Sequence, residues 1–124
     1  MKLVNPPGCP PQNPTYSQAA ISGRTVYVAG QIGIDPATGR LVADDVGAQT
    51  ERVFQSAAHV LEAAGSDLQR VVKVSVFLVD LADWPEMNAV YVRHFGDHAP
   101  PKSTVAVSAL ALGARVEIEF VAEI

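Results

Sequence analysis

The feature of the sequence that most constrains the fold is a long amphipathic segment followed, after a short gap, by a dense apolar run. Within residues 45–64, side chains that suit a buried face recur at steps of three and four residues: Val46, Thr50, Val53, Phe54, Ala57, Leu61 and Ala64. This spacing predicts one face of a helix. Residues 71–79 are rich in β-branched side chains, which predicts a strand covered on both faces for part of its length.

A second helix is predicted further along the chain. Asp83 with Glu86 three residues later resembles a capping box, and Pro85 fits the first turn of a helix. Gly96 is expected to end this helix. Its buried stripe is expected to consist of Met87, Val90, Tyr91 and Phe95.

The remaining regular segments read as strands. Residues 18–22 and 25–29 are β-prone, and Gly23-Arg24 between them predicts a tight hairpin. Residues 103–109 and 115–122 form the last two expected strands, and the final one alternates strictly between charged and apolar side chains. If these two strands are hairpin neighbours, Lys102 lies at the start of one, and Glu117 and Glu119 lie toward the end of the other.

Proline and glycine mark the irregular parts of the chain. Five of the nine prolines lie in the first 14 residues, which predicts an extended lead-in and neither a helix nor a central strand. Residues 35–39, Asp-Pro-Ala-Thr-Gly, predict a turn.

The order of these elements predicts a single α+β domain over residues 1–124, with two helices on one face of a mixed or largely antiparallel sheet. The other face of this sheet would carry Val, Ser, Thr and carboxylate side chains. Such a face is neither a plain solvent face nor a closed core. Packing against other subunits, with the carboxylates at the seam, would explain it.

Charge and composition narrow the partners. The chain has 124 residues, a formal net charge of −4 and a pI near 5.2, so nothing draws it to nucleic acid or to anionic membranes. No segment reads as a signal peptide or a membrane span. Cys9 is the only cysteine. We expect a cytoplasmic protein that binds neither nucleic acid nor membranes.

Lys102 and Glu117 form the strongest local constellation. A cation beside a carboxylate in a partly dry cleft can bind an anionic ligand and position a water molecule. The alternative is an exposed Lys and Glu at a sheet edge, where such charges prevent aggregation. His94 and His98 have the spacing of a metal pair, but Gly96 is expected to end the helix between them. We therefore expect no metal and no cofactor.

Several segments together resemble the RidA/YjgF family of enamine and imine deaminases, over nearly the whole chain. They are Pro14-Thr15-Tyr16-Ser17-Gln18, Val28-Ala29-Gly30-Gln31-Ile32, Asp35-Pro36-Ala37-Thr38-Gly39, Leu61-Glu62-Ala63-Ala64-Gly65, Val72-Lys73-Val74-Ser75-Val76-Phe77-Leu78, Met87-Asn88-Ala89-Val90-Tyr91, Pro101-Lys102-Ser103-Thr104-Val105 and Val116-Glu117-Ile118-Glu119. The resemblance implies a chorismate-mutase-like subunit, a homotrimer and ligand clefts between subunits. It also implies a small anionic metabolite as the ligand.

The resemblance assigns roles to particular positions. Glu117 matches the glutamate that positions the attacking water, and Lys102 stands at the position of the arginine that binds the substrate carboxylate. The family's substrate-binding positions fall on Tyr16, Gly30, Asn88 and Thr104. An ammonium cannot grip a carboxylate with the planar fork of a guanidinium, so ordinary activity on 2-iminobutanoate or 2-aminoacrylate is not assured.

Three functions remain open from the sequence. The first is an enzyme that hydrolyses an imine or enamine, with Lys102 holding an anionic group; a variant of it makes Lys102 a Schiff-base nucleophile with a lowered pKa. The second is a non-catalytic trimeric module that binds a small carboxylate or amino acid metabolite. The third is a ribonuclease or translation inhibitor, which the acidic charge disfavours.

Overall fold

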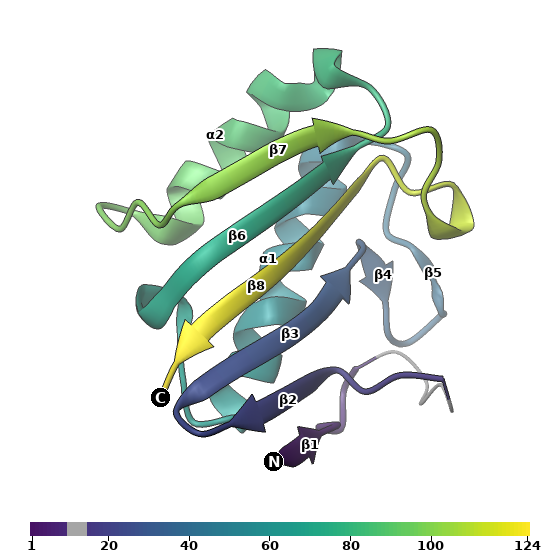
Figure 1. Ribbon diagram of the computed structural model, residues 1–124. Coiled ribbons are helices and arrows are strands. Elements are labelled where there is room, and N and C mark those ends of the chain that lie inside the picture. The colour runs from purple at the N-terminus through teal and green to yellow at the C-terminus, as the bar shows by residue number, and fades with distance from the viewer. Residues whose placement is uncertain (10–14) are drawn as a thin grey trace.

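The computed structural model describes residues 1–9 and 15–124, and it contains one six-stranded sheet with two helices on one face (Figure 1). In order across the sheet, the strands are β1 (Lys2–Val4), β2 (Ala19–Ser22), β3 (Thr25–Gln31), β8 (Val116–Glu123), β6 (Val71–Leu78) and β7 (Lys102–Ala106). The helices are α1 (Val46–Ala63) and α2 (Trp84–Phe95). The predicted α+β class, with two helices on one face of a mixed sheet, is confirmed.

Helix α1 follows the predicted pattern closely. Asp45 is its N-cap, and Asp45 Oδ2 accepts a hydrogen bond from the backbone N–H of Ala48 at 2.8 Å. Gly65 follows the helix with a φ of +84°, the left-handed conformation that glycine adopts most easily. Val53, Phe54 and the rest of the apolar stripe are buried against the sheet.

Helix α2 buries the stripe that the sequence predicts, but its predicted cap is wrong. Met87, Val90, Tyr91 and Phe95 are all buried. Asp83 makes no capping hydrogen bond; instead its carboxylate accepts two hydrogen bonds from the Arg115 guanidinium, each 3.0 Å long. A bidentate pair with a distant arginine is stronger than a local cap, so the tertiary contact prevails.

The two final strands are not neighbours, so they do not form the hairpin that would bring Lys102 and Glu117 together. Strand β7 pairs in parallel with β6, whereas β8 lies between β3 and β6 and is antiparallel to both. The chain passes from β6 through α2 to β7, the strand–helix–strand crossover by which adjacent parallel strands are joined. Lys102 and Glu117 are therefore separated by a whole strand.

The shorter features at the N-terminal side agree with the sequence where the structure describes them. Gly23 and Gly39 have positive φ in the β2–β3 hairpin and in the turn between β4 (Ile34–Asp35) and β5 (Arg40–Leu41). In the predicted lead-in, β1 forms the edge strand of the sheet and pairs with β2. The prolines at positions 10, 11 and 14 lie outside the described residues.

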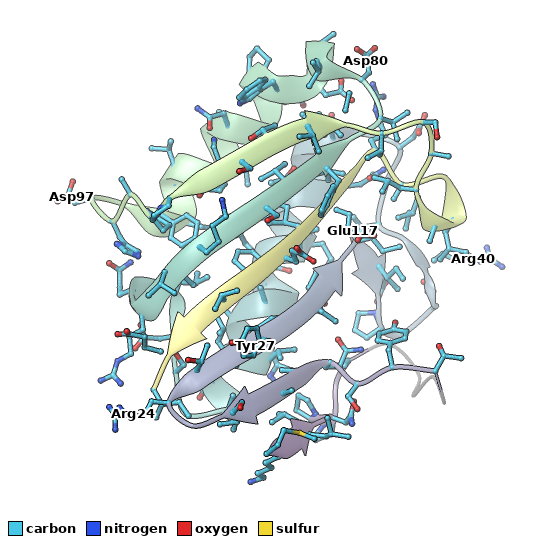
Figure 2. All side chains as sticks on the ribbon, in the orientation of Figure 1. Arg24, Tyr27, Arg40, Asp80, Asp97 and Glu117 are labelled. Atoms are coloured by element: carbon cyan, nitrogen blue, oxygen red, sulfur yellow. The ribbon has the colours of Figure 1, made fainter. Side chains whose placement is uncertain are left out.

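The second face of the sheet is open in the single chain. Figure 2 shows the Tyr27 and Glu117 side chains on this face, away from the helices. Tyr27 is 52% exposed, and Val105 and Glu119 are exposed as well. This mixture of aromatic, aliphatic and acidic side chains is what the sequence predicts for a face that packs against other subunits. Among the described residues, no helix combines the length and apolar character needed to cross a bilayer.

Candidate functional site

Lys102 begins the edge strand β7, and its side chain turns toward α2. Its Nζ donates a hydrogen bond to Asn88 Oδ1 at 3.0 Å. The same nitrogen lies 4.5 Å from the centre of the Tyr91 ring and 5.9 Å from that of the Trp84 ring. No carboxylate lies within ion-pair distance of Lys102 in the described part of the chain. Neutral groups of one helix therefore hold the ammonium, and its charge is left for a ligand.

Two opposing effects act on the Lys102 amine. Burial lowers its pKa below the ordinary value for lysine. The two aromatic faces attract the ammonium and favour the charged form, but burial decides the direction. A lowered pKa meets one requirement of a Schiff-base lysine, whereas the aromatic contacts suit a cation that binds an anion.

Two buried hydroxyl groups accompany Lys102 without a hydrogen-bond partner among the described residues. They are Tyr91 Oη and Thr104 Oγ1. Burial raises the pKa of Tyr91 to about 12, so its hydroxyl stays protonated and can donate a hydrogen bond at neutral pH. Thr104 lies two residues after Lys102 on the same face of β7. Together with the ammonium, these groups form a region rich in donors, which suits an anion.

Glu117 lies against a β-bulge in β3. Val28 pairs with Phe120 and Gln31 with Ile118, so Ala29 and Gly30 together oppose Glu119. A Cβ atom on residue 30 would lie 2.8 Å from Glu117 Cδ and even closer to Oε2. The carboxylate of Glu117 therefore rests on the backbone of Gly30, and only glycine leaves room for it.

The surroundings of Glu117 favour its protonated form. Burial, and then the negative charge of Glu119 two residues along β8, raise the pKa of Glu117 above its ordinary value. A carboxylate with a raised pKa is a stronger base than an exposed one. Glu117 is thus suited to accept a proton from water.

Lys102 and Glu117 lie on opposite faces of the sheet. In the parallel register Lys102 is paired with Val74, which is buried beneath the helices. Glu117 is paired with Phe77 on the open face, because paired residues of adjacent strands share a face. The two side chains cannot meet at one small molecule within a single chain.

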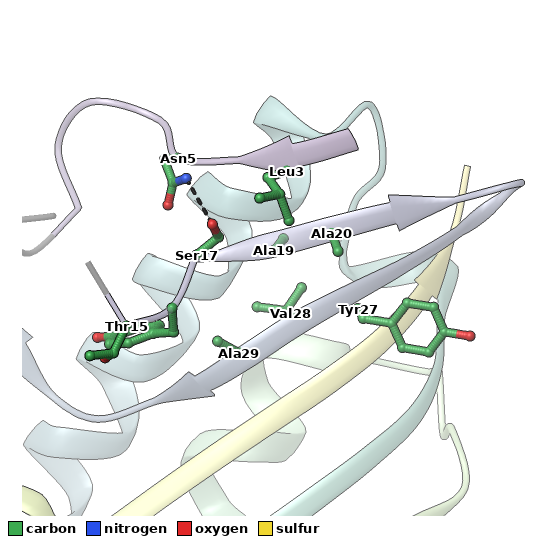
Figure 3. Close-up of a pocket in the computed structure, with 10 residues that line it drawn as sticks. Leu3, Asn5, Thr15, Ser17, Ala19, Ala20, Tyr27, Val28 and Ala29 are labelled. Atoms are coloured by element: carbon green, nitrogen blue, oxygen red, sulfur yellow. Dashed lines mark hydrogen bonds between the residues drawn. The ribbon is translucent and has the colours of Figure 1, made fainter. Parts of the chain in front are cut away.

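Tyr16 lies beside a separate hollow of about 830 Å³ at the β1–β3 edge of the sheet (Figure 3). Tyr27 and Ala20 line the hollow, and so does Ala29, the first residue of the bulge. The hollow therefore adjoins the contact between Gly30 and Glu117. The candidate residues form two groups: Tyr16, Gly30 and Glu117 near β3 and β8, and Asn88, Lys102 and Thr104 between α2 and β7.

His94 and His98 do not form a pair. His94 Nε2 contacts Glu51 Oε2 on α1, whereas His98 Nε2 lies 2.7 Å from the backbone oxygen of Val71. The described residues contain no cluster of three or more His, Cys, Asp or Glu side chains that could hold a metal ion. Both histidines link α2 and the loop after it to the rest of the fold.

Trp84 and Tyr91 were not singled out from the sequence as site residues. Trp84, Asn88 and Tyr91 follow one another at steps of four and three, so they share a face of α2. That spacing was the signal in the sequence that could have identified Trp84 and Tyr91 as neighbours of Asn88. Aromatic rings at a helix face usually serve the core, and only the position of β7 shows that these flank a lysine.

The sequence matches a known protein family. The family model described as Endoribonuclease L-PSP matches residues 10–124. The chain belongs to this family, the RidA/YjgF family. The human 2-iminobutanoate/2-iminopropanoate deaminase is 40% identical over 107 residues, which cover 86% of this chain and 78% of that protein.

Solved structures of RidA/YjgF proteins superpose closely on this chain. RidA from the Antarctic bacterium Psychrobacter sp. gives a TM-score of 0.94 at 40% identity, with all of both chains covered (100% of each). TdcF of E. coli, solved with bound serine, gives 0.93 at 31% identity and covers 100% of this chain and 99% of its own. The family thus contains a named imine deaminase and a protein that holds a small amino acid.

Proposed function

We propose that this protein is a cytoplasmic hydrolase of small imines and enamines, which works in clefts between the subunits of a homotrimer. The observation that carries the proposal is the Glu117 carboxylate, which rests on Gly30 with a raised pKa, in a chain whose relatives include a named imine deaminase. Lys102 binds the anionic group of the substrate. Tyr16, Asn88 and Thr104 shape the cleft.

The reaction uses water alone as the second reactant. Glu117 accepts a proton from water while the water oxygen bonds to the imine carbon and the C=N electron pair moves to nitrogen. The protonated Glu117 then returns its proton to that nitrogen. Glu117 then carries the proton of the new hydroxyl group to the same nitrogen. The C–N bond breaks, ammonia leaves and the carbon–oxygen double bond forms, which converts a 2-imino acid into a 2-oxo acid.

A second copy of the chain completes the cleft in this proposal. Lys102 and Glu117 point away from opposite faces of one sheet, so a ligand between them needs Lys102 from one subunit and Glu117 from the next. The open face of the sheet, with its exposed Tyr27 and Val105, supplies the surface for packing. A head-to-tail interface of this kind closes into a ring.

With lysine at position 102, the expected substrate preference differs from that of an enzyme with arginine at this position. Loss of one charge-assisted hydrogen bond to a carboxylate weakens binding by roughly 10- to 100-fold. Activity on 2-iminobutanoate is therefore expected to be low, and Lys102→Arg is expected to raise it.

A non-catalytic binding module is the second candidate function. It is favoured by the donor-rich surroundings of Lys102 and by the bound serine of the TdcF structure. A trimer of this kind would hold a small carboxylate or amino acid without converting it. The nuclease named in the family description is disfavoured by the net charge of −4.

One assay separates the two candidates. An amino acid oxidase generates 2-iminobutanoate in situ, and its loss is followed with the wild type, Lys102→Arg, Glu117→Gln and the double variant. Hydrolysis that Lys102→Arg increases and that Glu117→Gln abolishes in either background supports the enzyme. If neither the wild type nor Lys102→Arg exceeds the rate in buffer, the hydrolase proposal fails and the binding module takes its place.

A further inference from the structure

A second hollow of about 260 Å³ opens beside Lys102, between α2 and the loop that returns to β7. Tyr91, Val92 and Phe95 line it from the helix, and Pro100 lines it from the loop. Asn88 and Lys102 stand at its polar end. The hollow and the anion-binding ammonium are thus parts of one continuous surface, contributed by a single chain.

The polar end of this hollow has donors that the described residues leave unused. Lys102 Nζ donates to one neutral acceptor, Asn88 Oδ1, although an ammonium has three donors. The Tyr91 side chain is only 6% exposed, and its hydroxyl has no partner among the described residues. A buried donor without a partner is costly, so an acceptor is expected there when the site is occupied. A carboxylate bound to Lys102 would supply one.

Apart from His98, whose Nε2 lies 2.7 Å from the backbone oxygen of Val71, the rest of the hollow is apolar. Phe95 and Pro100 are buried and form its wall, while Val92 is 54% exposed at its rim. Water in such a place gains little from its neighbours, whereas a hydrocarbon group buries apolar surface there. The arrangement is that of a carboxylate anchor with an adjacent side-chain pocket.

We infer that the substrate is a 2-imino acid with a bulky apolar side chain, branched or aromatic, which fills the hollow while Lys102 holds the carboxylate. This inference rests on the proposed function and names the substrate class of the same cleft. The one- and two-carbon side chains of simpler imino acids leave most of the hollow empty. One added methylene in an apolar pocket changes discrimination by roughly 10-fold or more.

Stable 2-oxo acids test this inference without any turnover. The dissociation constants of 4-methyl-2-oxopentanoate and 2-oxobutanoate are measured by titration calorimetry for the wild type, Val92→Trp and Val42→Trp. Val92→Trp fills the rim of the hollow from an exposed position; Val42→Trp is the matched control, because Val42 is also exposed and does not line the hollow. Circular dichroism verifies that each variant is folded, and Val92→Phe serves if Val92→Trp is not.

The expected result is that the wild type binds the branched acid at least roughly 10-fold more tightly than 2-oxobutanoate. Val92→Trp removes that preference, and Val42→Trp keeps it. Equal binding of the two acids, no binding of either, or a preference that survives Val92→Trp overturns the inference. Imine hydrolysis without a side-chain preference leaves the proposed function in place while this inference fails. Selective binding of the branched acid without any imine hydrolysis keeps the preference for a bulky side chain, while the proposed hydrolase function fails.

Discussion

The Glu117 carboxylate occupies the space that a Cβ atom on residue 30 would need. An ideal Cβ there lies 2.8 Å from Glu117 Cδ, well inside contact distance. Residue 30 at the β3 bulge must therefore be glycine to leave room for the Glu117 carboxylate. The backbone conformation does not itself require glycine there, since the φ of Gly30 is not in the left-handed region. This contact connects a backbone irregularity directly to the proposed base.

Gly30→Ala is expected to impair catalysis while it spares the fold. The new methyl group displaces the Glu117 carboxylate, which sits at the end of a flexible side chain and can swing away. We expect kcat to fall by roughly 100-fold, because a misplaced base loses most of its contribution. The melting temperature should stay within a few degrees of the wild type. Steady-state kinetics and thermal unfolding measure the two effects.

Gly33→Ala is the matched control for this substitution. A Cβ on residue 33 would lie 2.7 Å from the Cα of Gln49 and 2.8 Å from its carbonyl oxygen, which are backbone atoms of α1. Backbone cannot move aside as a side chain can, so the unfolding free energy should fall by about 1–3 kcal/mol. If Gly30→Ala destabilises the protein as much as Gly33→Ala, the contact with Glu117 is not the reason for the glycine.

Glu119→Gln is expected to shift the pH dependence of activity. The negative charge of Glu119 is the second cause, after burial, of the raised pKa of Glu117. Without that charge the ionised form of Glu117 is less destabilised, so the pKa of Glu117 falls. Because the base acts when ionised, the acid limb of the kcat/KM profile should move to lower pH.

Glu123→Gln serves as the control for this pH shift, since it removes a charge from the same strand four residues further along. Its acid limb should coincide with that of the wild type. A profile that Glu119→Gln leaves unmoved, or moves to higher pH, would show that another group controls the acid limb.

Asn88→Asp is expected to weaken the binding of anionic ligands. The substitution places a carboxylate where Asn88 Oδ1 now accepts from Lys102 Nζ at 3.0 Å. The ammonium then has an internal counter-ion, with which a substrate carboxylate must compete. We expect KM to rise at least roughly 10-fold. Asn88→Ala separates the two causes, because it removes the hydrogen bond without adding a charge and should raise KM less.

Much of the fold could be predicted from local patterns. The α1 stripe depends on residues close in sequence, and it lies where the spacing predicts it. Strand pairing depends on distant segments instead. The position of β7 follows from the crossover through α2, which the pattern of residues 103–122 by itself does not contain.

The site was only partly predictable for the same reason. A glycine inside a strand pattern, such as Gly30, is a usable signal for a bulge. The aromatic partners of Lys102 depend on how α2 packs against β7, and Asp83 was assigned to a helix cap because its true partner, Arg115, is 32 residues away. Tertiary contacts decide which of several local possibilities a polar side chain adopts.

Asp83→Asn is expected to destabilise the protein through that distant contact. Asp83 is 12% exposed and Arg115 40% exposed, so the pair is screened less than a surface pair. We expect the unfolding free energy to fall by about 1–2 kcal/mol in urea titrations. Asp67→Asn in the exposed 4.0 Å pair with Arg70 is the control and should have no measurable effect. Equal effects would mean that the Asp83–Arg115 pair has no special role.

The central claim is that Lys102 and Glu117 act together from different copies of the chain. Lys102→Ala and Glu117→Gln, each inactive alone, are unfolded, mixed in equal amounts and refolded together. In a head-to-tail ring, one subunit supplies the lysine and its neighbour the glutamate. Random assembly then restores about one quarter of the sites.

The measurement is the imine hydrolysis rate of this mixture, with native mass spectrometry as the control that mixed oligomers have formed. The account predicts about one quarter of the wild-type rate per subunit. Mixed oligomers with no activity above that of the separate variants would contradict it, because the lysine and the glutamate of each site would then have to come from the same chain.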